Sequence, residues 1–110
     1  MKEKFTRIDT SGKFYYSDKE MAVFHREDGP AVEFHDGFKM WFIDGNLHRE
    51  DGPAIEYADG DKAWYIDGKR HREDGPAVEY ASATKAWYIN DKRLTEEEFM
   101  EHRDQRNKGK

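Results

Sequence analysis

The residues that could do chemistry are concentrated in one heptapeptide, His-Arg-Glu-Asp-Gly-Pro-Ala, which occurs without change at 25–31, 48–54 and 71–77. Each copy starts 23 residues after the previous one. A histidine beside two carboxylates is the material of acid–base catalysis and of metal binding, and an arginine fork can bind a carboxylate or a phosphate. The candidate side chains are His25, His48 and His71, with Arg26, Arg49 and Arg72.

The repetition itself argues against catalysis and metal binding. An active site is normally one asymmetric constellation, whereas three equal copies offer no distinguished set. Equivalent residues of successive hairpins stand about 10 Å apart, so one ion cannot bridge them, and a single copy offers about two ligands where zinc normally takes three or four. We therefore predict no catalytic residue, no metal site and no cofactor.

Two interpretations of the heptapeptide remain open. In the structural one, Asp28, Asp51 and Asp74 bond the backbone or the neighbouring arginines at a turn that Gly and Pro fix. In the other, the arginines form a row of forked donors that binds carboxylates or phosphates of a partner.

The composition limits the class of protein. A chain of 110 residues fits one domain, and although 39% of it is charged and 35% hydrophobic, its aromatic residues recur at fixed spacing, which indicates a folded chain. A net charge of −5 disfavours nucleic acid as a partner, and the absence of cysteine excludes disulfides and thiolate sites. No apolar run is long enough for a signal peptide or a membrane span, so we expect a cytoplasmic protein.

Turn signals divide the chain into predicted β-hairpins. Asp-Gly pairs at 36–37, 44–45, 59–60 and 67–68 separate aromatic and β-branched segments, which is the strongest short-range hairpin signal. The predicted single domain has a degenerate N-terminal cap at 1–24, three repeats at 25–94, a C-terminal helix at 95–106 and a frayed tail at 107–110.

The helix prediction rests on a capping box. Thr95 followed by Glu98 should begin a helix near Glu96. Phe99 and Met100 could then lay that helix over the last strand, which would otherwise expose an unpaired edge.

The hairpin register decides which side chains share a face. A two-residue loop at Asp59-Gly60 would place Ile55 opposite Trp64, so that Ile55, Tyr57, Trp64 and Ile66 form the core face, with Trp41 and Trp87 at equivalent positions. The other face is mixed, and it is either a structural ladder or an interface, since aromatic residues are enriched in interface hot spots. Its candidate binding residues are Phe42, Tyr65 and Tyr88, with Glu33, Glu56 and Glu79.

A 23-residue unit of the form HRxDGPA followed by DGxxxWYxxG resembles the variant MORN-like repeats of bacterial and bacteriophage proteins, over about residues 12–94. Together with the hairpin pattern, the resemblance implies an all-β fold, a single twisted antiparallel sheet of tandem hairpins with a short C-terminal capping helix. MORN-type arrays are mainly scaffolds for protein or phospholipid contacts, and some bacterial relatives of the variant repeat are labelled antitoxins.

The resulting prediction is a non-enzymatic protein-binding module that blocks a partner protein, as a phage or bacterial inhibitor or antitoxin-like protein, in the host cytoplasm if it is phage-encoded. Two alternatives stay open. One is sequestration of an anionic small molecule such as a nucleotide between protomers, and the other is self-assembly into a homo-oligomer through exposed sheet edges.

Overall fold

The structure is a computed structural model, and it describes residues 5–108. It is mostly β, with short strands in the segments that the sequence predicts as hairpins, followed by one helix. The elements are β1 (Phe5–Ile8), β2 (Gly12–Tyr16), β3 (Val32–Phe34), β4 (Lys39–Met40), β5 (Phe42–Ile43), β6 (Asn46–Leu47), β7 (Ile55–Glu56), β8 (Lys62–Ala63), β9 (Tyr65–Ile66), β10 (Lys69–Arg70), β11 (Val78–Glu79), β12 (Lys85–Ile89), β13 (Lys92–Leu94) and α1 (Glu96–Lys108).

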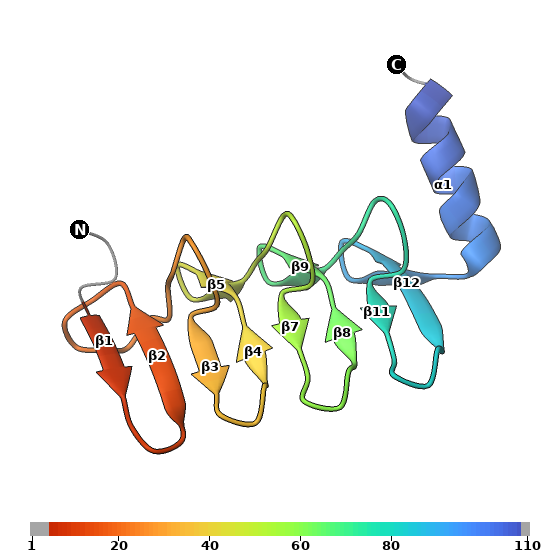
Figure 1. Cartoon of the computed structure of the whole chain (residues 1–110). Helices are drawn as coiled ribbons and strands as arrows, with labels where there is room; N and C mark the ends of the chain where they lie inside the picture. The colour runs from red at the N-terminus through yellow and green to blue at the C-terminus, as the bar shows by residue number, and fades with distance from the viewer. Residues whose placement is uncertain (1–4, 109–110) are drawn as a thin grey trace.

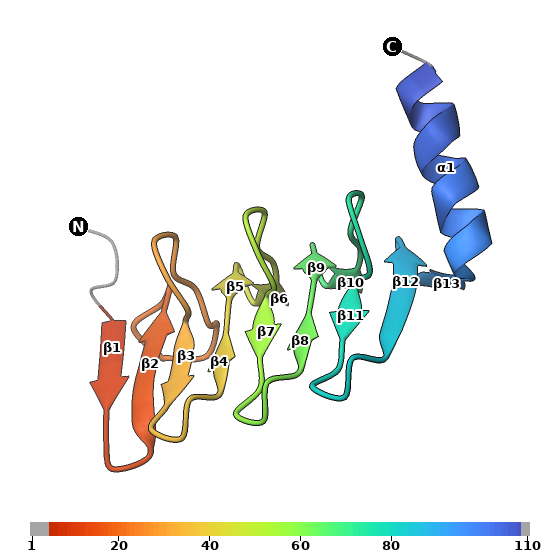
Figure 2. The same ribbon diagram turned by 45° about the vertical axis from the view of Figure 1, so that its right-hand side comes forward.

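Nine of these strands form one antiparallel sheet, in the order β1-β2-β3-β4-β7-β8-β11-β12-β13. The remaining strands form two small sheets, β5–β6 and β9–β10, so the prediction of a single sheet holds only for the larger part of the fold. Figures 1 and 2 show the hairpins standing side by side in chain order, with the heptapeptide loops projecting from one end of the sheet and α1 from the last hairpin.

The Asp-Gly turns are of two kinds. At Asp67-Gly68 both residues have positive φ, 50° and 81°, and Ile66 pairs with Lys69, which makes a two-residue type I′ loop. At Asp59-Gly60 only the glycine has positive φ, and its N–H donates to the Tyr57 carbonyl at 3.0 Å. This loop is one residue longer than predicted, because three residues rather than two separate its closing pair.

The longer loop changes the register, and the predicted faces are wrong as a result. Ile55 pairs with Ala63 and not with Trp64, so the tryptophans lie on the opposite side of the sheet from Ile55. Trp41, Trp64 and Trp87, predicted as core, are half-buried. Tyr57, also assigned to the core, is 42% exposed.

The best-packed part of the core lies at the N-terminal end of the sheet. Phe14, Tyr16 and Val32 are 5%, 6% and 1% exposed. The rings of Phe24 and Phe42 pack against this cluster, and the Phe24 ring stacks on Tyr16 with centroids 5.1 Å apart. This aromatic packing covers one face of the first two hairpins.

The C-terminal helix begins as the capping box predicts. The Thr95 N–H donates to Glu98 Oε1 at 2.9 Å, and the Glu98 N–H donates to Thr95 Oγ1 at 3.1 Å. The helix runs to Lys108, beyond the predicted end, while residues 109–110 of the predicted tail and 1–4 of the predicted cap lie outside the described residues.

Phe99, 1% exposed, anchors α1, which contacts β12 and β13 at its base. The rest of the helix projects from the sheet instead of lying along the last strand (Figure 1). Within residues 5–108, no helix is long and apolar enough to cross a membrane.

Candidate functional site

Each heptapeptide arginine stacks on an aromatic ring of the preceding hairpin. The Arg49 Cζ atom lies 3.9 Å from the ring centre of Trp41, and the same distance separates Arg72 from Trp64. In the first copy, Arg26 lies 4.0 Å above the ring of Tyr15. These are cation–π distances, so each loop is anchored on the hairpin before it.

The arginine donors are also bonded within the chain. Arg49 Nε donates to Asp51 Oδ1 at 2.9 Å, and its Nη1 donates to the Pro53 carbonyl at 3.1 Å and to Glu56 Oε2 at 3.2 Å. Hydrogen bonding and charge from Arg49 lower the pKa of the Asp51 carboxyl. Equivalent bonds join Arg72 to Asp74, Pro76 and Glu79, and Arg26 to Asp28 and Pro30.

The histidines hold the next turn of the chain. His48 Nδ1 accepts the N–H of Asp67, at the type I′ turn, over 3.0 Å. The other ring nitrogen, Nε2, lies 3.2 Å from Glu50 Oε2, and Nδ1 is also 3.2 Å from Asp67 Oδ1, so the ring lies between two carboxylates. His25 and His71 accept from the turn amides of Asp44 and Asn90 in the same way, at 2.9 and 3.0 Å.

These contacts support the structural interpretation of the heptapeptide. The Arg49 side chain is 22% exposed and bonded on several sides, whereas those of Glu50 and Asp51 are 81% and 88% exposed. The heptapeptide loops therefore present carboxylates to solvent. The arginine forks, which the binding interpretation expects to be free, are bonded within the chain.

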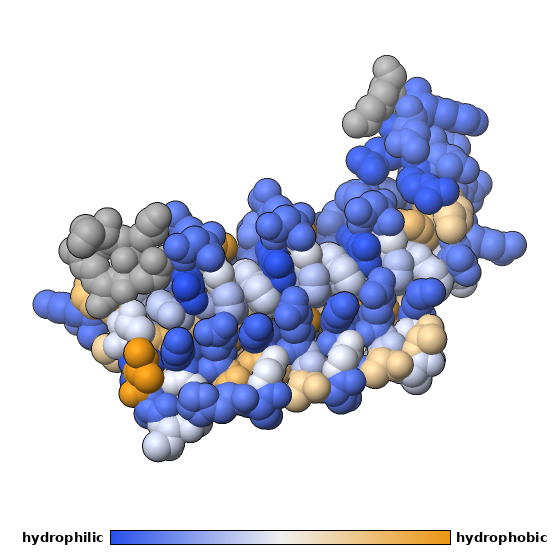
Figure 3. Space-filling model, viewed as in Figure 1, coloured by the Kyte–Doolittle hydropathy of each residue, from blue (hydrophilic) through white to orange (hydrophobic). Residues whose placement is uncertain are grey.

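The predicted glutamate candidates belong to a ladder of alternating charges across one face of the nine-stranded sheet. Glu56 pairs with Lys39 on one side and with Lys62 on the other. Opposite charges in such cross-strand pairs contribute about 0.2–1 kcal/mol each. This face, which is mostly hydrophilic in Figure 3, carries Lys13, Glu33, Lys39, Glu56, Lys62, Glu79 and Lys85 in register.

The opposite face carries an apolar row that begins with phenylalanine and contains alanines among its last three residues. In strand order, the paired residues are Phe14, Val32, Met40, Ile55, Ala63, Val78 and Ala86. Phenylalanine rings fill this face in the first hairpins, whereas alanine in the later ones leaves room above the strands. The face thus changes from a packed core into an open groove.

We call this opening the tyrosine groove. Its volume is about 390 Å³, and its lining includes Tyr57, Tyr65, Tyr80 and Tyr88, with Arg70 and Asp61. Partial burial is the main cause that raises the pKa of Tyr57 above its usual value, so the hydroxyl stays neutral at physiological pH.

Arg70 is the cation of the tyrosine groove. Its Nε donates to Tyr65 Oη at 3.3 Å, and its Cζ lies 5.0 Å from the ring centre of Tyr88. Asp61 is already engaged, because its Oδ1 accepts the Ala81 N–H at 2.7 Å. The groove therefore combines aromatic faces, hydroxyl groups and one guanidinium.

The structure separates the residues predicted to share the mixed face. Tyr65 and Tyr88 line the tyrosine groove, Phe42 packs against the core, and the predicted glutamates lie across the sheet in the charge ladder. Sequence reasoning missed Tyr57, Tyr80 and Arg70. The 23-residue spacing of Tyr57 and Tyr80 would have indicated the first two, had the longer hairpin loop been recognised.

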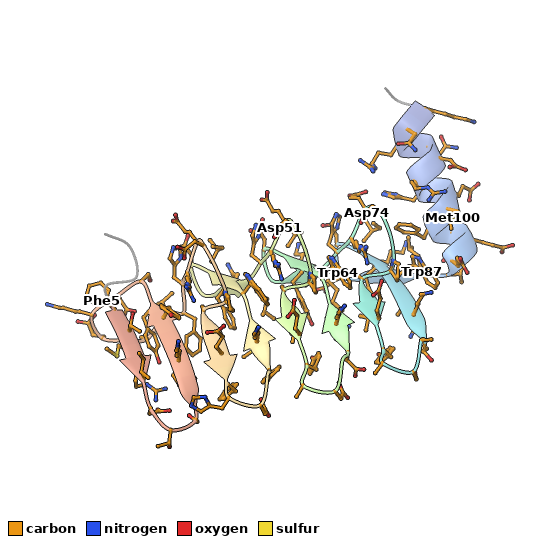
Figure 4. All side chains as sticks on the ribbon, viewed as in Figure 1. Phe5, Asp51, Trp64, Asp74, Trp87 and Met100 are labelled. Atoms are coloured by element: carbon orange, nitrogen blue, oxygen red, sulfur yellow. The ribbon has the colours of Figure 1, made fainter. Side chains whose placement is uncertain are left out.

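Hollows of a second kind lie between successive heptapeptide loops, which stand out as separate hydrophilic projections in Figure 3. The hollow between the first and second loops has a volume of about 840 Å³ and is lined by Trp41 and Ile43 as well as by loop residues. The next, of about 740 Å³, contains Trp64 and Ile66. Figure 4 shows Trp64 between the loops that carry Asp51 and Asp74.

No protein-family model matches the chain, and no curated protein or solved structure is significantly similar to it. Among residues 5–108, no group of three or more histidine, aspartate or glutamate side chains is placed to hold a metal ion. The candidate functional surfaces are therefore the tyrosine groove and the hollows between the heptapeptide loops.

Proposed function

We propose that the chain is a non-enzymatic, protein-binding module of the MORN-like type, which holds a segment of its partner in the tyrosine groove. The observation that carries the proposal is the change along the apolar face, where tightly packed phenylalanines give way to partly exposed tyrosines. Tyr57 and Tyr80 are 42% and 45% exposed. Tyrosine is enriched in interface hot spots because it supplies a large contact area at low conformational-entropy cost.

The proposal includes a role as an inhibitor or antitoxin-like protein of phage or bacterial type. Such a role requires that a partner surface be occupied, and it requires no reaction. The bonds from arginine to aspartate and to the proline carbonyl, and from the turn amide to histidine, recur in all three heptapeptide loops, which supports a scaffold rather than one distinguished catalytic centre. The resemblance of the 23-residue unit to MORN-like repeats supports the same class.

A second candidate is the capture of an anionic aromatic small molecule, such as a nucleotide, in the same groove. Arg70 favours it, because a guanidinium beside Tyr65 and Tyr88 could bind a phosphate while the rings stack on a base. The groove volume of about 390 Å³ lies within the usual range for small-molecule sites.

The test compares the wild type with a Tyr57→Ser, Tyr80→Ser variant in affinity capture from lysate of the source cell or its host. The matched control is Ile8→Ser, which removes an exposed apolar side chain (66% exposed) from β1, far from the groove. We expect one protein to be retained by the wild type and the control and lost by the groove variant, and the purified pair to bind directly.

Retention of the same protein by all three forms would refute recognition through the groove. Native mass spectrometry of the purified chain with a nucleotide panel tests the second candidate. A bound nucleotide that the groove variant loses would favour small-molecule capture over protein binding.

A further inference from the structure

The hollows between the heptapeptide loops form a second recognition surface, separate from the tyrosine groove. We infer that they bind a basic, extended segment of a partner protein, whose lysine or arginine side chains enter successive hollows. The site is new with respect to the groove, and it does not depend on what the groove binds.

The shape of each hollow fits a long cationic side chain. Trp41 and Ile43 supply the apolar part of the first lining, and Glu27, Glu50 and Asp51 supply carboxylates from the two loops. Lysine and arginine bury their aliphatic stems against apolar surface while keeping the charged end among polar groups. A volume of about 840 Å³ leaves room for such a stem between the loops.

The charge balance of the first hollow also favours a cation. The two arginines of its lining, Arg26 and Arg49, are each 22% exposed and bonded to an aspartate and a proline carbonyl, so neither is a free positive charge. Among residues 5–108, Glu27 and Glu50 pair only with histidines, His25 and His48, and their side chains are 62% and 81% exposed. Each of these histidines also faces a second carboxylate, Asp44 at 3.3 Å or Asp67 at 3.2 Å, so the loops carry more carboxylates than their histidines could balance.

The chain itself supplies the missing cation at the third loop. Glu73 is the equivalent of Glu27 and Glu50, and it receives Arg106 of α1, whose Nε lies 3.1 Å from Glu73 Oε1. His102 of the same helix lies 3.4 Å from that oxygen. A basic segment docked on a heptapeptide glutamate is therefore a contact that this structure already contains, and within the part of the chain that the structure describes the glutamates of the first two loops have no such arginine.

The spacing of the loops sets the spacing of the partner's cations. Successive loops are two strand spacings apart, about 10 Å. A polyproline II segment advances about 9.3 Å in three residues, and its threefold symmetry places every third side chain on one side. The partner segment should therefore carry lysine or arginine at every third position.

The experiment measures fluorescence anisotropy of a labelled peptide of four Arg-Pro-Pro units with the full-length protein. The comparison peptide has the same composition with its arginines contiguous. The protein variant is Glu27→Gln, Glu50→Gln, and the matched control is Glu97→Gln, Glu101→Gln, which changes the net charge equally on exposed positions of α1.

We expect the wild type to bind the spaced peptide at least about fivefold more tightly than the contiguous one. One exposed ion pair is worth up to about fivefold in affinity, so the hollow variant should lose about three- to tenfold and the control less than about twofold. The Tyr57→Ser, Tyr80→Ser variant should bind like the wild type, which separates this site from the groove.

Equal affinity for the two peptides would overturn the inference, because it would mean attraction by net charge alone. Equal losses in the hollow and control variants, or no binding of the spaced peptide at about 1 mM, would overturn it as well. A second copy of the chain is the other possible occupant of the hollows, and sedimentation of the protein alone tests for it. Self-association of the wild type that is lost in the Glu27→Gln, Glu50→Gln variant would show that the hollows bind a second copy. Circular dichroism confirms that each variant is folded.

Discussion

Replacing Arg49 with alanine should destabilise the fold much more than an ordinary surface substitution. The guanidinium stacks on Trp41 in the preceding hairpin and is bonded to Asp51, the Pro53 carbonyl and Glu56 in its own loop and the next strand. The alanine substitution removes all of these contacts at once, including the stacking that holds this heptapeptide loop on the preceding hairpin.

The magnitude follows from these contacts. Stacking on Trp41 is worth about 0.5–1 kcal/mol, and the bond to the Pro53 carbonyl about 0.5–1.5 kcal/mol. The ion pair with Glu56 is partly screened by solvent and adds about 0.2–1 kcal/mol, whereas the pair with the exposed Asp51 is not counted. We therefore expect the free energy of unfolding to fall by about 1–3.5 kcal/mol.

The assay is urea denaturation followed by circular dichroism and tryptophan fluorescence. Arg93→Ala, an exposed arginine of β13, is the control and should change the free energy of unfolding by less than about 0.5 kcal/mol. Arg26→Ala should fall between the two, because Arg26 makes the stacking, aspartate and proline contacts but, among residues 5–108, no glutamate bond like that to Glu56.

A second substitution, Gly52→Ala, tests whether Arg49 stabilises the fold through the bonded position of its guanidinium. A Cβ atom added at Gly52 would lie 2.9 Å from Arg49 Cζ, so Gly52→Ala should displace the bonded guanidinium. It should destabilise the wild type but have little further effect on Arg49→Ala. Additive losses, or an Arg49→Ala loss no larger than that of Arg93→Ala, would refute the reasoning.

The remaining predictions concern the capping histidine, the loop glutamate at the helix and the anchor of the helix. His48→Ala should cost about 1–2 kcal/mol, because the turn amide that it caps loses its acceptor, and that amide should exchange hydrogen faster; unchanged exchange would contradict this. Partial burial alone would raise the pKa of Glu73, but hydrogen bonding and charge from His71 and neighbouring Arg106 hold it below its usual value. Its stabilising contribution is therefore present above the unfolded-state pKa and lost as the pH falls through the folded-state pKa, so the stability advantage over Glu73→Gln should shrink on acidification; a constant difference would argue against it. Phe99→Ala should cost about 3–4 kcal/mol and reduce the helical circular dichroism signal, whereas an unchanged signal would show that α1 is held by other contacts.

Features determined by neighbouring residues could be predicted from the sequence. The start of α1 depends on Thr95 and Glu98, which bond each other's backbone, so the four-residue pattern was sufficient. The turn at Asp67-Gly68 likewise depends on two residues that tolerate positive φ.

The hairpin register could not be read in the same way. Asp59-Gly60 is the same dipeptide as Asp67-Gly68, yet only its glycine adopts positive φ and the loop is one residue longer. The dipeptide permits either loop, and a slip of one residue moves every side chain of a strand to the other face. The tryptophans and Tyr57 were misplaced for this single reason.

The candidate site was harder to predict than the fold because its contacts join distant segments. Nothing near Arg49 in the chain indicates that the ring of Trp41 lies beneath it, so the arginine could be read as a free donor. The tyrosine groove depends on the size of residues from several strands, such as Ala63 and Val78. Which residues share that face depends on the hairpin register, and the predicted register was wrong.

The stacking of each arginine on the ring of the hairpin before it has a consequence for how the gene could change. Arg49 reaches Trp41 and Arg72 reaches Trp64 across the same interval of chain. Deleting residues 48–70 would set Arg72 behind Trp41 with the same spacing, and duplicating them would add one more identical joint. The number of 23-residue units could therefore change between descendants of one gene without requiring a new kind of contact between units. Only the two end segments of the chain have no equivalent elsewhere in the sequence.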